Sequence, residues 1–600
     1  MFRLWRIFVV AIVLLLHPLT IARATPAQQP STQSTANNYA EQAQQLFGQM
    51  PPAERVGQLF LITFTGIDTG PESDIYDLIA NHYVGGVILK AENNNITGNT
   101  ISSDSVPQQL LTLTNTLQEI ALTGQTPSTG NDTLTESATP LPAVTPTSGP
   151  APPPRTAIPL FVSLPHSNNS IGGLTEIPSQ MAIGATWETA QAEAVGQIIG
   201  RELQSLGINM LVGPSLDLVS DAPQEQIAAG LGTDVFGSNP YWVSQMGKSY
   251  VTGIKTGSNG RLAVIATHFP GIGSSNRPSY AEVATVRRSL EALQENELLP
   301  FTTAVSMETA VDGLLTAHVR YQGLQGNILP NTAPFSFDPQ AIETILQTER
   351  LVNWRNNGGL LVSDALGVQA IELFYDSGRQ EFPHRQVAKD ALLGGNDLLY
   401  AGEFALGEQN FALQSNNLRD TLLWFQERYA TDPAFQMRVD QAVLRILELK
   451  LKLYAGDFTA ENVIQDPQNL SNILDTEDNT TFSLAQNALT LLAPTAEELT
   501  DRLPSPPGTA DNVLIFTDIQ QSRQCSTCSV VPLISQTAMQ ERILALYGPV
   551  GSGQIQPEQI TSFSLAELQT FLDQPLTTIS PAPVPEQPSP TADPDVIPND

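Results

Sequence analysis

The sequence predicts an α/β fold, a (β/α)8 barrel followed by the start of a smaller α/β domain. Short, almost continuously apolar runs alternate with amphipathic segments, and this alternation is typical of parallel strands covered by helices. Eight such units follow one another within about 400 residues, which favours a closed barrel over an open sheet. The eight runs are QLFLITF (58–64), VGGVILK (84–90), PLFVSL (159–164), INMLVGP (208–214), LAVIATHF (262–269), GLLTAHV (313–319), GLLVSDA (359–365) and NDLLYAG (396–402).

Helical patterns follow most of these runs. The segments 188–207, after the third run, and 338–349, after the sixth, have the spacing of amphipathic helices. A last helix, 437–456, carries apolar residues at i, i+3 and i+4 and ends at Gly456. The barrel is therefore expected to occupy residues 46–456.

The first 24 residues have the pattern of an export signal. Arg3 and Arg6 precede the apolar run 7–16, and the small residues of Ala22-Arg23-Ala24 suit cleavage after Ala24. The apolar run is too short for a transmembrane span of about 20 residues, and no later segment of the sequence is apolar enough to make one. We therefore expect an extracytoplasmic protein, secreted or at the cell surface, with no membrane contact beyond this signal.

A second α/β pattern begins after the barrel. NVLIFTDI (512–519) is expected to be a buried strand and MQERILALYG (539–548) a helix. Because only one or two such units precede a Pro-rich tail, either the segment packs on the barrel or the natural chain continues past Asp600. The predicted organisation is a signal peptide (1–24), a flexible leader (25–45), the barrel (46–456) with a disordered insertion (126–156), a linker (457–483), a partial C-terminal α/β domain (484–575) and the tail (576–600).

Charge and cysteine content exclude several kinds of partner. The formal net charge of −32 and pI near 4.4 argue against nucleic acid, because a phosphate-binding surface needs clustered Lys and Arg. The two cysteines, Cys525 and Cys528, predict a local disulfide outside the cytoplasm. A zinc site would need a second ligand pair, and no histidine follows His384, so we expect no metal and no cofactor.

Four ionisable residues stand at the predicted carboxyl ends of strands: Asp217, His268, His318 and Asp364. In a (β/α)8 barrel these ends meet at one mouth, where active sites lie. Each residue alone could cap or fix a loop, but burying several polar groups is costly, so together they favour a site. No Gly-rich phosphate loop or G-x-S-x-G elbow accompanies Asp364, which leaves carboxylate catalysis, most commonly glycoside hydrolysis.

Longer stretches carry a resemblance to a known family. They include VGGVILKAENN (84–94), IGRELQSLGINMLVGPSLDL (199–218), THFPGIG (267–273) and LLVSDALGVQAI (360–371). On these motifs, residues from about 50 to 456 resemble the N-terminal barrel of glycoside hydrolase family 3, particularly its bacterial β-N-acetylhexosaminidase branch. TLLAP near residue 490 is similar to the start of that family's second, α/β domain.

The resemblance implies roles for three residues. Asp364 falls on the family's nucleophile, which would attack the anomeric carbon and form a covalent glycosyl-enzyme with retention of configuration. Asp217 falls on a substrate-binding aspartate, and His268 on the first histidine of the family's KHFPGHG motif, also a substrate-binding position. The implied partner is a β-linked oligosaccharide or cell-wall glycan.

Other family positions carry different residues here. Loss of a general acid typically costs about 10²–10⁴-fold in rate, so these changes bear directly on activity. The proton donor stays open among Tyr280, Glu282 and the C-terminal domain. The changed positions are Thr267 for the lysine and Ile272 for the second histidine of KHFPGHG, Pro278-Ser279-Tyr280 for the Asp-Ser-His acid/base triplet, PHSNNSI (165–171) for DQEGGRV, and Asp234 for the arginine of GTRSFG.

Two classes of function follow. The first is an exported retaining β-glycosidase, most simply of the β-N-acetylhexosaminidase type, which the retained Asp364, Asp217 and His268 favour. The alternative is a catalytically impaired family member that serves as a glycan-binding or scaffold module, which the changed positions favour. Because function is carried by the site and not by the fold, the barrel itself does not separate the two.

Overall fold

The computed structural model describes residues 32–573 in part. The predicted signal peptide, the Pro-rich tail and nearly all of the predicted insertion 126–156 lie outside the described residues. Within the described part, no helix is both long and apolar enough to cross a membrane. The segments left out between 32 and 573 are 98–104, 127–154, 167–170, 221–228, 408–409, 469, 471–479, 492, 494, 496, 500–509, 524 and 527.

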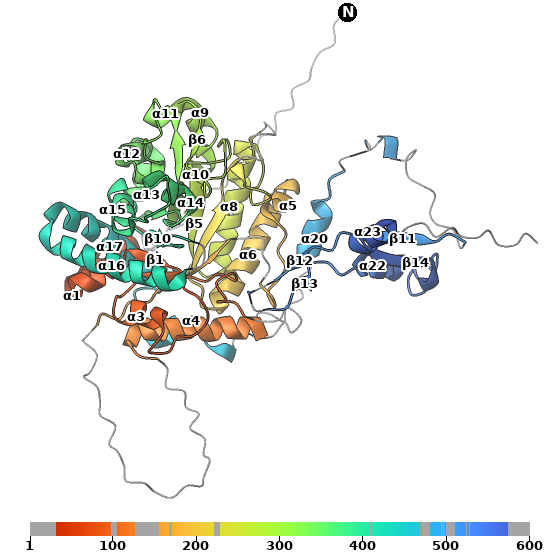
Figure 1. Ribbon diagram of the computed structural model, residues 1–600, viewed down its shortest axis with the longest axis horizontal. Helices are drawn as coiled ribbons and strands as arrows, with labels where there is room; N and C mark the ends of the chain where they lie inside the picture. Colours follow the sequence, from red (N-terminus) through yellow and green to blue (C-terminus); the bar gives the residue numbers. More distant parts are fainter. Residues whose placement is uncertain are drawn as a thin grey trace, which may run out of the picture.

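Eight parallel strands form the barrel that the sequence predicts (Figure 1). Their order in the sheet is β10-β1-β2-β3-β4-β5-β7-β9, and a parallel bridge between Val362 and Leu398 joins the last strand back to the first. The predicted fold class, an α/β barrel, is confirmed. The strands are β1 (Phe60–Ile62), β2 (Gly86–Ile88), β3 (Phe161–Pro165), β4 (Met210–Ser215), β5 (Ala263–Phe269), β7 (Gly313–Thr316), β9 (Leu360–Ser363) and β10 (Leu399–Ala401).

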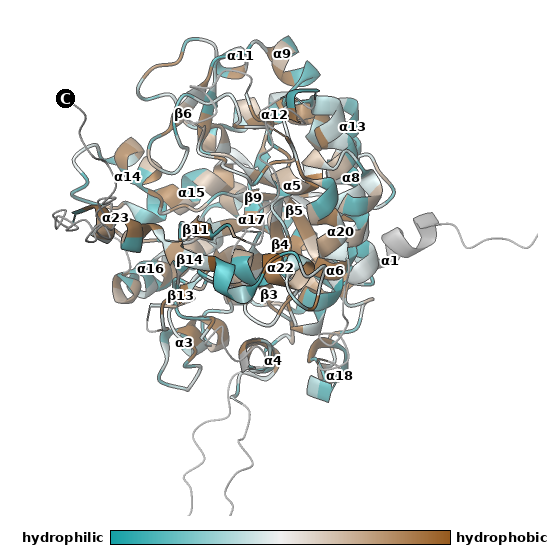
Figure 2. Ribbon diagram, turned by 90° about the vertical axis from the view of Figure 1, so that its right-hand side faces the viewer, coloured by the Kyte–Doolittle hydropathy of each residue, from teal (hydrophilic) through white to brown (hydrophobic). Residues whose placement is uncertain are grey.

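Helices enclose the strands on the outside, and Figure 2 shows β4 and β5 in the middle of the molecule with α6, α8 and α13 around them. Helices α6 and α8 pack closely because both present glycines at the contact: a Cβ on Gly196 would lie 2.3 Å from the carbonyl oxygen of Tyr250. The covering helices are α3 (Asp74–Ala80), α4 (Ser105–Thr123), α5 (Gln180–Ala185), α6 (Thr189–Ser205), α8 (Pro240–Gly257), α9 (Leu290–Glu295), α10 (Leu298–Ala304), α12 (Pro339–Leu346), α13 (Glu349–Asn356), α14 (Gln369–Tyr375), α15 (His384–Gly394), α16 (Phe411–Thr431) and α17 (Pro433–Leu453).

A buried ionic cluster ties together the amino-terminal end of the barrel. The side chain of Asp397, just before β10, is fully buried and accepts hydrogen bonds from Arg355 (Nη2 to Oδ1, 3.0 Å), Arg438 (3.2 Å) and the backbone N–H of Leu361 (3.0 Å). Burial alone would raise the pKa of Asp397, but the arginines outweigh it and lower the pKa to about 2. This end of the barrel is therefore held by charge as well as by packing.

The N-terminal leader differs from the prediction. Residues 25–45 were expected to be flexible, but α1 (Thr32–Gln49) is a helix that packs against α17. Its apolar residues Tyr39, Ala43, Leu46 and Phe47 recur at i, i+4, i+7 and i+8, so they form one stripe toward the core, where Ala43 is 2% exposed. The prediction was wrong for this helix because composition was weighed above periodicity.

Part of the predicted linker 457–483 also packs on the barrel. Helix α18 (Ala460–Val463) buries Val463, and Gln465 exchanges hydrogen bonds with Asn115 of α4. Helix α20 (Thr480–Asn487) then lies against α5 and α6 through the fully buried Leu484. These contacts fasten the start of the second unit to the barrel.

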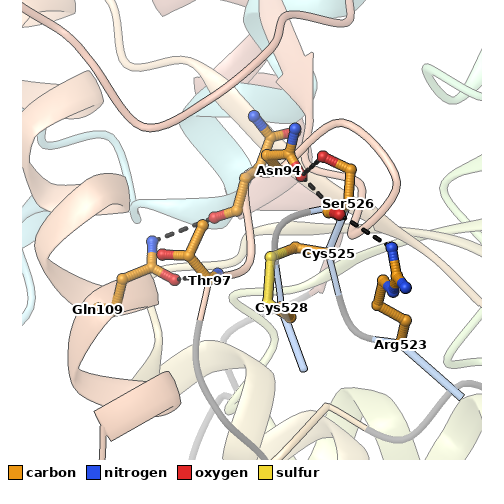
Figure 3. Close-up of a disulfide and its surroundings, with 8 residues drawn as sticks. Asn94, Thr97, Gln109, Arg523, Cys525, Ser526 and Cys528 are labelled. Carbon is orange, nitrogen blue, oxygen red and sulfur yellow. Dashed lines mark hydrogen bonds between the residues drawn. A yellow bond between two sulfur atoms is a disulfide. The ribbon is translucent and has the colours of Figure 1, made fainter. Parts of the chain in front are cut away.

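The second unit is small. Its parallel pair β11 (Val513–Thr517) and β14 (Ile560–Ser564) is accompanied by α22 (Ala538–Tyr547) and α23 (Leu565–Asp573), beside the hairpin of β12 (Gln521–Ser522) and β13 (Val531–Pro532). The predicted disulfide between Cys525 and Cys528 is confirmed. Ser526, between the cysteines, donates hydrogen bonds from its N–H and hydroxyl to Asn94 Oδ1 at 2.7 and 2.8 Å, which brings this loop to the end of the barrel where β2 emerges (Figure 3).

Candidate active site at the mouth of the barrel

The four predicted residues lie at one end of the barrel. Asp217 follows β4, His268 is the penultimate residue of β5, His318 follows β7 and Asp364 follows β9. Parallel strands deliver their carboxyl ends to the same mouth, so the topology brings the four together as the sequence predicted. Their side chains, however, differ in burial and in what they contact.

Asp217 is the buried support of His268. Its Oδ2 accepts hydrogen bonds from His268 Nδ1 (2.8 Å), the His268 backbone N–H (3.1 Å) and the Ser215 hydroxyl (2.9 Å), while Oδ1 accepts from the Ile272 backbone N–H (2.7 Å). The carboxylate has no exposed surface, so it has none left for a sugar. The geometry therefore assigns Asp217 to positioning the imidazole, in place of the direct substrate contact that the resemblance implied.

His268 is the exposed member of this pair. Its side chain is 28% exposed at the mouth. Burial alone would lower the pKa of His268, but the carboxylates of Asp217, Asp364 and Asp234 more than offset that effect and raise it. Asp234, the aspartate that replaces a family arginine, thus contributes to the raised pKa of the imidazole.

His318 holds the loop that carries Asp364. It is fully buried, and its Nε2 lies 3.0 Å from the carbonyl oxygen of Ala365, so this nitrogen carries a hydrogen and donates it. Burial lowers the pKa of His318, so the neutral ring accepts at Nδ1 from the Ser336 hydroxyl at 2.7 Å. His318 is therefore a positioning residue.

Of the four predicted residues, Asp364 is the carboxylate that keeps exposed surface at the mouth. Its Oδ1 accepts from the backbone N–H of Ala365 at 2.8 Å, and its own N–H donates to the Thr316 carbonyl at 3.2 Å. The residue is partly exposed, and its negative charge raises the pKa of both His268 and Tyr400. Asp364 is thus a hydrogen-bonded, partly exposed carboxylate, near enough to His268 for its charge to raise the pKa of that ring, and a carboxylate of this kind can act as a nucleophile toward an anomeric carbon.

A lysine at the mouth was missed by the sequence reasoning. Lys90, two residues after β2, has a side chain only 16% exposed and lies 3.5 Å from Glu92 and 3.7 Å from Glu403. Burial would lower the pKa of Lys90, but the hydrogen-bonded Tyr400 hydroxyl and the two glutamates raise it. The signal was present, because Lys90 directly follows an apolar run in VGGVILK.

A cavity of about 430 Å³ opens beside Lys90. Its lining includes Thr63 from the end of β1, Glu403 after β10, Tyr280 from the loop after β5, and Glu372 on α14. Burial raises the pKa of Glu372, although Arg379 contacts it at 2.6 Å. This volume suits a small polar ligand.

A larger cavity, of about 900 Å³, lies at the opposite end of the barrel. Three of its charged lining residues are joined through Asp312, whose Oδ1 accepts from Lys452 at 3.0 Å and whose Oδ2 contacts Lys255. Because these charges are already paired and the predicted residues lie at the other end, we do not place the site there.

The proton-donor candidates are placed as follows. Tyr280 is 62% exposed and lines the cavity beside Lys90, whereas Glu282 is half-exposed and forms an ion pair with Arg277. Thr267 and Ile272, which replace family polar residues, are 6% and 3% exposed and pack in the interior. An imidazole–carboxylate pair does not occur at 278–280, since these residues are Pro-Ser-Tyr.

The loop after β3 contributes a half-buried imidazole. His166 Nε2 lies 2.6 Å from the Tyr250 hydroxyl, and burial lowers the pKa of His166 to about 4, so the ring is neutral at physiological pH. Residues 167–170 of the changed PHSNNSI loop lie outside the described residues. Among the residues that are described, no group of three or more His, Cys, Asp or Glu side chains is arranged to hold a metal ion.

Comparisons with known proteins point to one family. Residues 151–408 match the glycosyl hydrolase family 3 N terminal domain. Beta-hexosaminidase A of Pseudoalteromonas piscicida is 25% identical over 312 residues, which are 50% of this chain and 44% of that protein. A beta-hexosaminidase of Methylococcus capsulatus is 28% identical over 199 residues, 33% of this chain and 53% of that protein, so the chain spans about half the length of these relatives.

A solved structure has the same fold. The glycoside hydrolase family 3 beta-N-acetylglucosaminidase from Paenibacillus sp. str. FPU-7 aligns with a TM-score of 0.59 at 21% identity, covering 86% of this chain and 82% of that one. At this identity the likeness establishes the fold alone, while the matched domain and the named relatives establish the lineage. The domain match over residues 151–408 and the relatives named beta-hexosaminidase support membership of glycoside hydrolase family 3, in its hexosaminidase-like branch.

Proposed function

We propose that this chain is an exported retaining β-glycosidase of the β-N-acetylhexosaminidase type, with Asp364 as its nucleophile. The observation that carries the proposal is the partly exposed Asp364 at the mouth of a family 3-like barrel, close enough to His268 for its charge to raise the pKa of that imidazole. Relatives named beta-hexosaminidase support the sugar class. The N-terminal segment, with Arg3 and Arg6 ahead of an apolar run, and the Cys525–Cys528 disulfide support a location outside the cytoplasm.

The proposed reaction has two steps. A carboxylate oxygen of Asp364 attacks the anomeric carbon, the bond from that carbon to the leaving oxygen breaks, and the leaving oxygen takes up a proton from solvent water. A water molecule then attacks the anomeric carbon, the bond from that carbon to Asp364 breaks, and the attacking water gives its proton back to solvent, which regenerates the Asp364 carboxylate. His268, oriented by Asp217, donates a hydrogen bond to a sugar hydroxyl and offsets the negative charge around the nucleophile.

The missing acid/base triplet determines which substrates react. A phenol such as Tyr280 normally has a pKa near 10 and is a poor donor at neutral pH. We therefore expect activated aryl glycosides, which need little acid assistance, to react about 10²–10⁴-fold faster than glycosides with alkyl leaving groups. The same changes favour the second candidate function, a glycan-binding module without turnover.

The deciding experiment compares the mature chain with Asp364→Asn on a panel of nitrophenyl and 2-fluoro β-glycosides. The proposal expects nitrophenol release by the wild type, and a mass increase of one glycosyl unit on Asp364 with the 2-fluoro sugar. Asp364→Asn should lose both. If the two proteins behave alike on every sugar, the hydrolase proposal is wrong, and oligosaccharide affinity without turnover would then identify the binding module.

A further inference from the structure

Three large aromatic side chains gather on the surface between α6 and α8. Trp187 is 59% exposed, Tyr241 57% and Trp242 36%. Trp242 contacts both of the others edge-to-face, with ring centroids 5.3 Å from Trp187 and 5.4 Å from Tyr241. Large apolar rings are normally turned inward, so a contiguous exposed group of three indicates a binding surface. We call these three residues the aromatic platform.

The backbone presents the platform and does not bury it. Asn239 caps α8 by accepting from the backbone N–H groups of Tyr241 and Trp242, which fixes both residues in the first turn. Trp187 has a φ of +57°, a left-handed conformation that is uncommon for a bulky side chain. Backbone of this kind is retained where the position of the side chain matters.

The platform lies on the same face of the barrel as the candidate active site. Helices α6 and α8 follow β3 and β4, so their first turns stand at the carboxyl ends of the strands. Helix α5, which directly precedes Trp187, is tied to the end of β4 by hydrogen bonds between the Gln180 side chain and the Ser215 backbone at 2.9 and 3.1 Å. The platform therefore stands on the side of the mouth formed by β3 and β4.

Local charge identifies the kind of ligand. The segment 238–247 contains no charged residue, and the segment 187–194 contains only the acidic Glu188 and Glu193. Phosphate-bearing polymers and anionic membranes need basic residues, which these segments lack. Neutral pyranose rings instead stack their C–H faces on aromatic rings, while indole N–H and phenol O–H groups bond to their hydroxyls.

We propose that Trp187, Tyr241 and Trp242 form an accessory stacking site for a neutral β-linked N-acetylhexosamine oligosaccharide that also occupies the barrel mouth. The sugar class rests on the proposed function, whereas the site itself rests on the platform. The platform would then select long substrates over short ones without contacting the reacting bond.

The test uses chito-oligosaccharides of one to six sugars with the mature chain and the double variant Trp187→Ala/Trp242→Ala. Calorimetry should give an affinity for the hexasaccharide at least about tenfold weaker in the double variant, with no change for the monosaccharide. Nitrophenyl monosaccharide hydrolysis should stay within about twofold, because the platform lies outside the reacting site. Leu423→Ala on α16, whose side chain is 56% exposed, is the matched control for loss of surface apolar area.

The outcomes separate this inference from the proposed function. If neither protein hydrolyses the aryl sugar but the hexasaccharide affinity still depends on the platform, the site stands and the hydrolase proposal is wrong. Equal hexasaccharide affinity in wild type and a double variant with an unchanged melting temperature overturns the inference. Concentration-dependent dimerisation that the double variant abolishes also overturns it, because a second copy would then be the occupant.

Discussion

Asp217→Asn is the substitution that tests the site most sharply. The wild-type carboxylate accepts four hydrogen bonds, three at Oδ2 and one at Oδ1, in a side chain with no exposed surface. An amide has one acceptor oxygen. In its better orientation that oxygen keeps the three bonds at Oδ2, and the new NH2 group then faces the backbone N–H of Ile272.

The magnitude follows from these contacts. An unsatisfied buried N–H costs about 1–3 kcal/mol, and replacing a charged acceptor by a neutral one weakens the His268 bond by roughly 1 kcal/mol. We expect the unfolding free energy to fall by roughly 2–4 kcal/mol. Urea unfolding followed by tryptophan fluorescence, at pH 6, measures this change as a lower midpoint with an unchanged slope.

The pH dependence gives a second readout. Because the folded protein raises the pKa of His268 above its usual value near 6.5, the protonated form stabilises the fold. This contribution is fully present below about pH 6.5 and is lost as pH rises through the higher folded pKa. Asp217→Asn should flatten that pH slope, as His268→Gln does, and the double variant should be less destabilised than the sum of the two.

One result would refute this reasoning. If Asp217→Asn unfolds at the wild-type urea midpoint and keeps the wild-type pH slope, Asp217 does not hold a cationic His268. A loss of stability with the slope intact would show that the carboxylate only ties the loop through Ile272.

Three further predictions concern other parts of the chain. Asp397→Asn should destabilise the barrel by about 3–5 kcal/mol by leaving buried arginines unpaired, and the wild type should lose about 2–3 kcal/mol as pH falls from about 4 to about 2, both measured by urea unfolding. An unchanged urea midpoint in Asp397→Asn would contradict the claim that the ion pairs of Asp397 with the arginines stabilise the barrel. Lys90→Met should reduce kcat/KM on an aryl β-glycoside by about 10–100-fold, whereas Lys90→Arg, which keeps the positive charge, should retain part of the activity. Equal losses in the two variants would indicate that Lys90 acts through its packing and not through its charge. Cys525→Ser should change the unfolding free energy of the barrel, measured with urea, by no more than about 0.5 kcal/mol, and a larger loss would show that this loop supports the barrel. The same substitution should speed proteolytic cleavage near Ser526, which mass spectrometry detects.

Much of the fold was readable from the sequence because strands and helices differ in period. Six of the eight apolar runs contain a whole barrel strand, β3 and β4 extend one residue past their runs, and the helical segments 188–207 and 437–456 contain α6 and most of α17. Helix α1 was missed although its apolar residues follow a helical spacing, because Gln, Thr and Ser dominate the composition of the leader. Local composition thus misled where periodicity would have succeeded.

The sequence alone determined which residues reach the mouth, since position at a strand end is a local property. It placed Asp217, His268, His318 and Asp364 there, and the structure places them at the same end. Only the tertiary structure decided what each one does. Asp217 and His318 are buried behind other groups, and Asp364 stays accessible, because burial and hydrogen bonding depend on neighbours that come from other strands and distant loops. The raised pKa of His268 depends likewise on Asp217, Asp234 and Asp364, which follow different strands or loops and act on one ring only in the folded barrel.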